Sequence, residues 1–254
     1  MTPHIGATTD EAQRRIGRAV ALQTIKALRG EVVDTPVNMP HLQAALTPEL
    51  KRYSVLAERL GSFTGQYIDF NPSECRFIYR GELTTETATV VRLAFLKGFL
   101  SRTVDEDTHI SFVNVGSLVE SRGIGIVEED DPSFEAYRSA LRVVVSSKGK
   151  DFRIGGTVFD ETHARFTYLD GFTLEMEPRG HFLVVRNQDR PGMIGRIGMT
   201  LGEGGVNIDA FELSRRSKGG VAMALIRTDE PVAPSIIEEL QRMSGILRVH
   251  AIDL

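Results

Sequence analysis

Residues 181–252 limit the fold of this chain more than any other stretch, because their apolar residues follow two different spacings within a short length. Strand-like runs occupy 181–186, 207–214, 220–227 and 246–252. Helical spacing follows the first of these runs and returns at 235–243. The order strand, helix, strand, strand, helix, strand predicts a ferredoxin-like βαββαβ unit.

The first helix of this unit is expected to begin at Pro191, because proline favours the first helical position. Ile194, Ile197 and Leu201 follow at helical spacing and form its predicted buried stripe. The glycine-rich run Gly202-Glu203-Gly204-Gly205 is expected to end the helix. In the second helix, Ile236, Ile237 and Leu240 are the residues expected to face inward.

Residues 31–178 change from helical spacing to strand-like spacing along their length. Helices are predicted at 48–61, 85–99 and 114–123, and strands at 75–79, 124–128, 139–146, 152–159, 164–169 and 172–176. In the helix at 48–61 the expected buried residues are Leu50, Val55, Leu56 and Leu60. This order predicts an α+β domain, built from helices plus an antiparallel sheet, that ends near Pro178.

Residues 8–29 form the predicted N-terminal helix. Thr8 and Glu11 have the spacing of a capping box, and Gly30 favours a helix end. The sequence therefore predicts three parts, with bounds at 1–30, 31–178 and 179–254.

The overall composition narrows the classes of function. Thirty Lys and Arg against 34 Asp and Glu give a net charge of −4, which argues against a nucleic-acid partner. No apolar run reaches the roughly 20 residues that span a bilayer, and the first residues lack the pattern of a secretory signal. Cys75 is the single cysteine, so no cysteine-based metal site is expected, and the thiol is predicted to be a small buried hydrophobe. The six histidines show no metal-ligand spacing, so no metal site is expected there either. The predicted localisation is cytoplasmic.

The segment Asn187-Gln188-Asp189-Arg190-Pro191-Gly192 is the best candidate binding site. Asn187 and Asp189 are two residues apart at the end of a strand, which predicts side chains on the same side. Backbone N–H groups where Pro191 and Gly192 open a helix suit the carboxylate of a free amino acid, and Asp189 suits its ammonium group. Asn207, at the start of the next strand, is expected to add a donor or acceptor from a neighbouring subunit.

A purely structural interpretation of these residues remains open. Asp189 is also a good N-cap for the helix, and Asn207 is a residue that turns tolerate at unusual backbone angles. Capping and ligand binding are compatible with each other.

Three groups of motifs carry a resemblance to a known family, D-3-phosphoglycerate dehydrogenase. The segment from Thr2 through His4 to Gln13 resembles the part of these enzymes that holds the catalytic histidine and the exit helix. The candidate loop, with Gly205-Val206-Asn207-Ile208, resembles the ligand loop of their ACT domain. Val37-Asn38-Met39-Pro40, Arg80-Gly81-Glu82-Leu83 and Phe112-Val113-Asn114 look like their intervening domain.

This resemblance implies a regulatory portion of an enzyme that oxidises 3-phosphoglycerate with NAD in the first step of L-serine synthesis. By resemblance, ACT domains pair side by side in a homo-oligomer. Serine then binds between them at the positions of Asn187, Asp189, Arg190, Pro191 and Gly192, together with Asn207. By resemblance, His4 is the general acid and base of the intact enzyme.

The chain also departs from the family pattern. No G-x-G-x-x-G motif follows a strand, and Gly192, Gly195 and Gly198 recur at the spacing of helix packing. The carboxylate and the arginine that accompany the histidine in the family have no counterpart here. The chain alone is therefore expected to bind no NAD and to be inactive, with His4 then a surface residue of a frayed N-terminus. The helix at 8–29 is expected to be loosely held.

Other functions stay open at this point. A free-standing ACT amino-acid sensor would share every feature of the loop, and glycine or phenylalanine could replace serine as the effector. The β-type subunit of L-serine dehydratase joins similar domains, but its Ser-His-Thr motif is missing. Five arginines of the central part are either an anion site for a phosphorylated effector or members of solvated faces: Arg76, Arg80, Arg92, Arg102 and Arg122.

Overall fold

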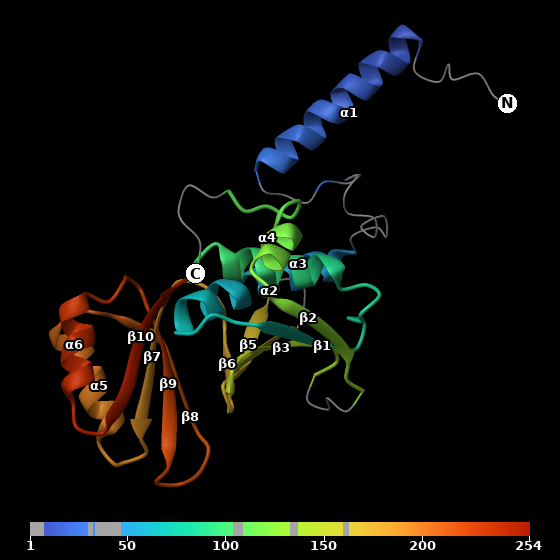
Figure 1. Cartoon of the computed structure of the whole chain (residues 1–254). Helices are drawn as coiled ribbons and strands as arrows, with labels where there is room; N and C mark the ends of the chain where they lie inside the picture. Colours follow the sequence, from blue (N-terminus) through green and yellow to red (C-terminus); the bar gives the residue numbers. More distant parts are fainter. Residues whose placement is uncertain (1–7, 30–32, 34–46, 104–108, 133–136, 160–162) are drawn as a thin grey trace.

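The computed structural model describes residues 8–29, 33, 47–103, 109–132, 137–159 and 163–254. Its helices are α1 (Asp10–Leu28), α2 (Pro48–Tyr67), α3 (Thr89–Leu100), α4 (Val115–Ser121), α5 (Met193–Glu203) and α6 (Pro234–Arg242) (Figure 1). Its strands are β1 (Glu74–Arg80), β2 (Gly125–Asp130), β3 (Ala140–Ser147), β4 (Lys150–Val158), β5 (Ala164–Leu169), β6 (Phe172–Met176), β7 (His181–Gln188), β8 (Ile208–Arg215), β9 (Val221–Thr228) and β10 (Ile246–Asp253). The predicted α+β class is confirmed.

The described part of residues 47–176, here called the central unit, contains a six-stranded sheet in the order β2-β1-β3-β4-β5-β6. β1 and β2 run parallel, whereas the other neighbours run antiparallel. The expectation of a wholly antiparallel sheet was therefore wrong. The chain crosses from β1 to β2 through α3 and α4, and such a crossover returns the strand in the same direction. α2 packs on β4 and β5 and lies against α3.

Two details of the central helices differ from the expectation. α3 begins at Thr89 rather than at residue 85, because residues 84–88 form a turn in which the amides of Thr87 and Ala88 donate to the carbonyl of Thr84. Val55, expected to be buried, is 51% exposed, whereas Leu56 and Leu60 are fully buried. The buried face of α2 is set by the sheet below it and leaves Val55 on the outer side.

Residues 181–254, here called the C-terminal unit, confirm the predicted βαββαβ order. Their antiparallel sheet has the order β10-β7-β9-β8. Because side chains alternate along a strand, each strand presents residues to two faces. Leu183, Val185 and their neighbours pack under α5 and α6. Phe182 and Val184 join the core of the central unit, so both faces of this sheet are covered (Figure 1).

α5 begins two residues later than expected, at Met193. Pro191 is therefore not its first residue, and Gly192, with φ of +83°, occupies the N-cap position. Ile197 and Leu201 are buried as predicted, but Ile194 is 48% exposed. Met193 is buried in its place, because the buried stripe follows the positions 193, 197, 200 and 201.

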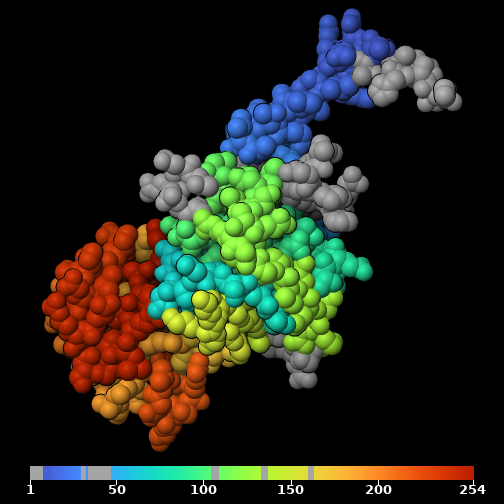
Figure 2. All heavy atoms as spheres, viewed as in Figure 1, coloured from blue at the N-terminus to red at the C-terminus, as the bar shows by residue number. Residues whose placement is uncertain are grey.

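α1 is helical as predicted, with Thr9 instead of Thr8 as its N-cap. The Thr9 hydroxyl accepts a hydrogen bond from the amide of Ala12 at 3.2 Å. No α1 residue is buried, and its apolar residues Val20 and Leu28 are 59% and 74% exposed. The helix projects away from the rest of the molecule (Figure 2).

Within the described ranges, every helix is too short or too polar to cross a membrane.

Candidate functional site

The candidate loop lies where β7 ends, and two neighbouring turns hold its backbone. The amide of Gln188 donates to the carbonyl of Gly245, the turn before β10, at 2.8 Å. The amide of Asp189 donates to the carbonyl of Gly220, the turn before β9, at 2.8 Å. The loop is therefore fixed between two turns before it enters α5.

Asp189 binds the β8–β9 turn and does not cap α5, so the capping interpretation was wrong. Its Oδ2 accepts hydrogen bonds from the amide of Gly219 and from Nη1 of Arg215, both at 2.9 Å. The Gly219 amide, followed by the Arg215 guanidinium, holds the pKa of Asp189 below its usual value. The carboxylate is consequently charged at neutral pH and fixed in position beside the helix start.

Asn187 is the buried polar residue of the loop, at 2% exposure. Its Nδ2 donates to the carbonyl of Gln188 at 2.8 Å, which fixes the orientation of the amide group. Its Oδ1 is buried and has no hydrogen-bond partner among the described residues. Leaving a buried acceptor unpaired costs about 1–3 kcal/mol. The site thus contains one buried acceptor, Oδ1 of Asn187, that a ligand donor can pair with.

The N-terminal end of α5 completes the loop. No side chain caps its first turn, and a Cβ atom built on Gly192 or Gly195 meets nothing within 4 Å. The first amides of a helix have no acceptor within the helix and carry a partial positive charge. Arg190 and Pro191 are exposed beside it. An anionic group therefore finds open space and amide donors at this end.

Asn207 lies at the opposite end of the same sheet. β7 and β9 pair with Asn187 opposite Ala222, whereas Ile208, which follows Asn207, pairs with Thr228 at the other end of β9. The side-chain Nδ2 of Asn207 donates to Oδ2 of Asp229 at 2.6 Å. The residue with a left-handed backbone in this connection is Gly205 and not Asn207. The interpretation of Asn207 as a turn residue with unusual backbone angles was therefore wrong as well. Within one chain, Asn207 is not brought to the loop.

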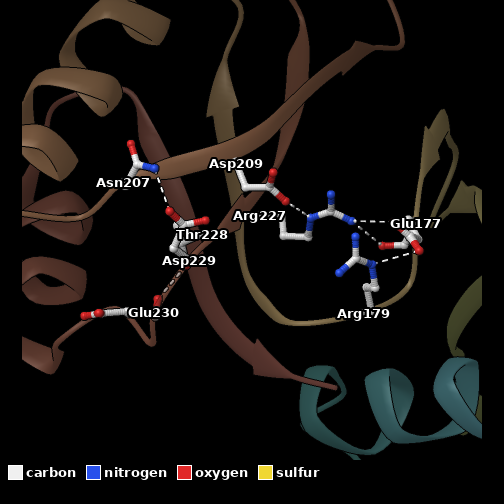
Figure 3. A network of polar contacts seen from close by, with 8 residues as sticks. All are labelled: Glu177, Arg179, Asn207, Asp209, Arg227, Thr228, Asp229 and Glu230. Carbon is white, nitrogen blue, oxygen red and sulfur yellow. Dashed lines mark hydrogen bonds and ion pairs between the residues drawn. The ribbon is translucent and has the colours of Figure 1, made fainter.

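A second polar cluster, which the sequence did not predict, ties the segment between the two units to the C-terminal sheet (Figure 3). Arg227 on β9 binds Asp209 on β8 and, at 3.3 Å, the carboxylate of Glu177. Arg179 binds the same carboxylate at 2.8 Å. Burial opposes ionisation of Glu177, but the two arginines still hold its pKa below the usual value. Fifty residues separate Glu177 from Arg227, so no local pattern revealed the pair.

The arginines of the central unit are dispersed over several elements. Arg76 pairs with Glu74 and Glu129, and Arg92 pairs with Glu128. Arg102 donates to the backbone of Asp253, and Arg122 lines a separate cavity of about 470 Å³. Those contacts match solvated faces better than one anion site.

Cys75, His4 and the motif at 37–40 are the remaining candidates from the sequence. Cys75 is fully buried, and burial raises the pKa of its thiol to about 12, which confirms the expectation of a small buried hydrophobe. His4 and the motif at 37–40 lie outside the described residues.

Comparison with known proteins gives two family matches. Residues 49–170 match the D-3-phosphoglycerate dehydrogenase intervening domain, and residues 181–245 match the ACT domain. Three similar curated proteins carry the name D-3-phosphoglycerate dehydrogenase. The protein of Methanocaldococcus jannaschii is 36% identical over the whole chain, and that of Bacillus subtilis is 29% identical over the whole chain. The protein of Mycobacterium leprae is 35% identical over 91% of the chain. The alignments take in 48%, 48% and 44% of these relatives, so the chain spans about half of their length.

Proposed function

Since the chain belongs to the D-3-phosphoglycerate dehydrogenase family and carries its intervening and ACT domains, we propose that it senses L-serine through the loop 187–192. The observation that carries this proposal is the buried, unpaired Oδ1 of Asn187. A buried acceptor of this kind accepts a hydrogen bond from the ammonium group of an amino acid. The charged Asp189 supplies the opposite charge, and the open N-terminal end of α5 receives the carboxylate.

A second copy of the chain would complete this site. β8 is an edge strand, and an exposed edge favours pairing with another chain. If two β8 strands pair antiparallel about a two-fold axis, the start of one strand lies beside the end of the other. Asn207 of the partner subunit would then lie at the sheet end that holds Asp189. This arrangement explains why one chain alone keeps the two residues apart, and it supports a homo-oligomer.

The proposed mechanism is a shift between two arrangements of subunits. Serine has an effect only if it binds the two arrangements with different affinity. The second face of the ACT sheet packs on the central unit, and Arg227 on that sheet binds Glu177, the residue that follows the last strand of the central unit. A change at the paired ACT sheets is thereby passed to the central unit. In the intact enzyme, NAD-dependent oxidation of 3-phosphoglycerate would be the step controlled, in the cytoplasm.

The bounds of the three predicted domains, 1–30, 31–178 and 179–254, stay a prediction.

Other sensors and other ligands would use the same contacts. A free-standing sensor would bind the same ligand through the same loop, and glycine or phenylalanine would use the same ammonium and carboxylate contacts.

The test is a calorimetric titration of the chain with L-serine, glycine and L-phenylalanine. Asp189→Asn keeps an acceptor for the Gly219 amide but removes the charge, and we expect at least a tenfold weaker affinity for serine. Glu203→Gln, which removes an exposed charge at the far end of α5, should leave the affinity unchanged. Equal serine affinities for Asp189→Asn and the wild type would refute the proposed site.

A further inference from the structure

A cavity of about 400 Å³ lies between the two units, apart from the ACT loop. The central unit contributes Tyr67 at the end of α2, Asp69 just beyond it, and Lys150 at the start of β4. The C-terminal unit contributes Arg186 on β7 and Arg248 on β10. The volume falls within the usual range of small-molecule sites.

Two buried donors at this cavity lack a partner. Tyr67 is only 4% exposed, and its hydroxyl has no hydrogen-bond partner among the described residues. Burial raises the pKa of Tyr67, so the hydroxyl keeps its proton and remains a donor. Arg186 binds Asp170 through Nη2, but its Nε is buried without a partner. Both groups call for the same kind of ligand atom, an oxygen acceptor.

Two of the positive side chains at the cavity come from neighbouring strands of the C-terminal sheet. Arg186 and Arg248 are directly opposite on the paired strands β7 and β10. Like charges in that position destabilise a sheet unless a negative group lies between them. Asp69 meets Arg248 only at 3.4 Å and Lys150 only at 3.6 Å, and its carboxylate is 60% exposed. Because both ion pairs are long, Arg248 and Lys150 can still donate hydrogen bonds to an anion that binds in the cavity.

The local charge balance sets the size of that anion's charge. Three cations line the cavity: Lys150, Arg186 and Arg248. Among the lining carboxylates, Asp151 meets Arg153 outside the cavity, which leaves Asp69 and Asp170. His250 packs on the Tyr67 ring, and burial lowers its pKa to about 4, so it is neutral at pH 7. One positive charge is left unmatched.

We propose that this cavity binds a small monocarboxylate that bridges the two units. One carboxylate group accepts from the Tyr67 hydroxyl and from Nε of Arg186, while Lys150 and Arg248 compensate its charge. Ile68, Phe70 and Phe152 line the rest of the cavity and contact the apolar body of the ligand. A dianion such as phosphate exceeds the single unmatched charge and is disfavoured by Asp69 and Asp170. Bridging contacts from both units would hold them in the docked arrangement.

The experiment titrates the full chain with benzoate, acetate and inorganic phosphate by calorimetry. We expect benzoate to bind more tightly than acetate, which lacks an apolar body, and more tightly than phosphate. Tyr67→Phe removes only the hydroxyl and should raise the dissociation constant of benzoate at least fivefold, as should Arg186→Gln. Tyr137→Phe and Arg242→Gln, matched changes away from the cavity, should leave it unchanged.

Thermal unfolding gives an independent readout on the same variants. Because the Tyr67 hydroxyl is unpaired without a ligand, Tyr67→Phe should unfold at the same temperature as the wild type or higher when no benzoate is present. Benzoate should then raise the unfolding temperature of the wild type, Tyr137→Phe and Arg242→Gln by a similar amount, and that of Tyr67→Phe by less. Equal benzoate affinities for the wild type and Tyr67→Phe, or tighter binding of phosphate, would overturn the proposal. The Asp189→Asn variant should bind benzoate normally, which separates this site from the serine site.

Discussion

Single glycines fix how closely α2 and α3 approach each other. A Cβ atom on Gly61 would lie 2.0 Å from the carbonyl oxygen of Phe95, and one on Gly98 would lie 2.0 Å from that of Glu58. Both obstacles are backbone atoms, which cannot rotate away as a side chain does. The two helices therefore touch through their backbones, and the core beneath them depends on this contact.

Gly61→Ala should lower the free energy of unfolding by about 3 kcal/mol, because the methyl group forces the helices apart. Urea unfolding followed by circular dichroism measures the change. Gly116→Ala in α4 is the matched control, since its Cβ meets nothing within 4 Å, and it should leave stability equal or slightly higher. A loss below 1 kcal/mol for Gly61→Ala would contradict the close packing.

The limits of sequence reasoning are clearest at Asp189. Its place at a strand end and beside a helix start was predictable from local spacing. Its actual partners, Arg215 and Gly219, are 26 and 30 residues further along the chain. A single sequence carries no signal for the pairing of a side chain with a distant turn. The unpaired oxygen of Asn187 is invisible for the same reason, because it depends on what surrounds it.

At the scale of helices and strands, the presence of an element was easier to predict from the sequence than its end residues or the strand that it pairs with. Strands of the C-terminal unit follow a spacing of two residues that reads directly from the sequence, and all four were found. α5 starts two residues later than predicted, because Gly192, with its left-handed backbone, is the N-cap, whereas Pro191 was expected to be the first helical residue. The parallel pairing of β1 and β2 follows from a crossover through α3 and α4, which local spacing does not encode.

α1 gives the prediction at this scale. Its apolar residues have no cover among the described residues, and a helix gains most of its stability from a packed face. In hydrogen exchange, the amides of residues 12–28 should exchange at rates near those of an unfolded chain, as predicted from the sequence. The amides of residues 56–64 in α2 are the internal control and should be strongly protected. Comparable protection of both segments would show that α1 has a partner surface.

For the whole molecule, the connection between the two units is expected to decide how cooperatively the chain unfolds. The side chain of Gln66 in α2 exchanges two hydrogen bonds with the backbone of Asp253 in β10, at 2.8 and 3.0 Å. Arg227 and Glu177 join β9 to the end of the central sheet. These contacts lie beside a continuous apolar core, so the units are expected to unfold together in a single transition.

Acid should weaken this connection. The folded-state pKa of Glu177 is below its unfolded value, so its contribution is complete above that unfolded value of about 4.5 and disappears as the pH falls through the folded pKa. Thermal unfolding between pH 7 and pH 3 should therefore show a smaller loss of stability in Arg227→Gln than in the wild type. Arg242→Gln, which removes an exposed pair with Glu238, should follow the wild type. Parallel curves for Arg227→Gln and the wild type would contradict this role of Glu177.

The double coverage of the ACT sheet also limits how this chain can be rearranged. A cut at Gly180 would uncover one whole face of that sheet, with Phe182, Val184, Met223 and Leu225 turned toward water. Contiguous apolar patches of this kind drive proteins to associate. The C-terminal third therefore depends on the central unit to cover one face of its sheet, and it cannot be moved to another protein by itself. A fusion protein that uses this third as a sensor must also include α2, which covers that face of the sheet.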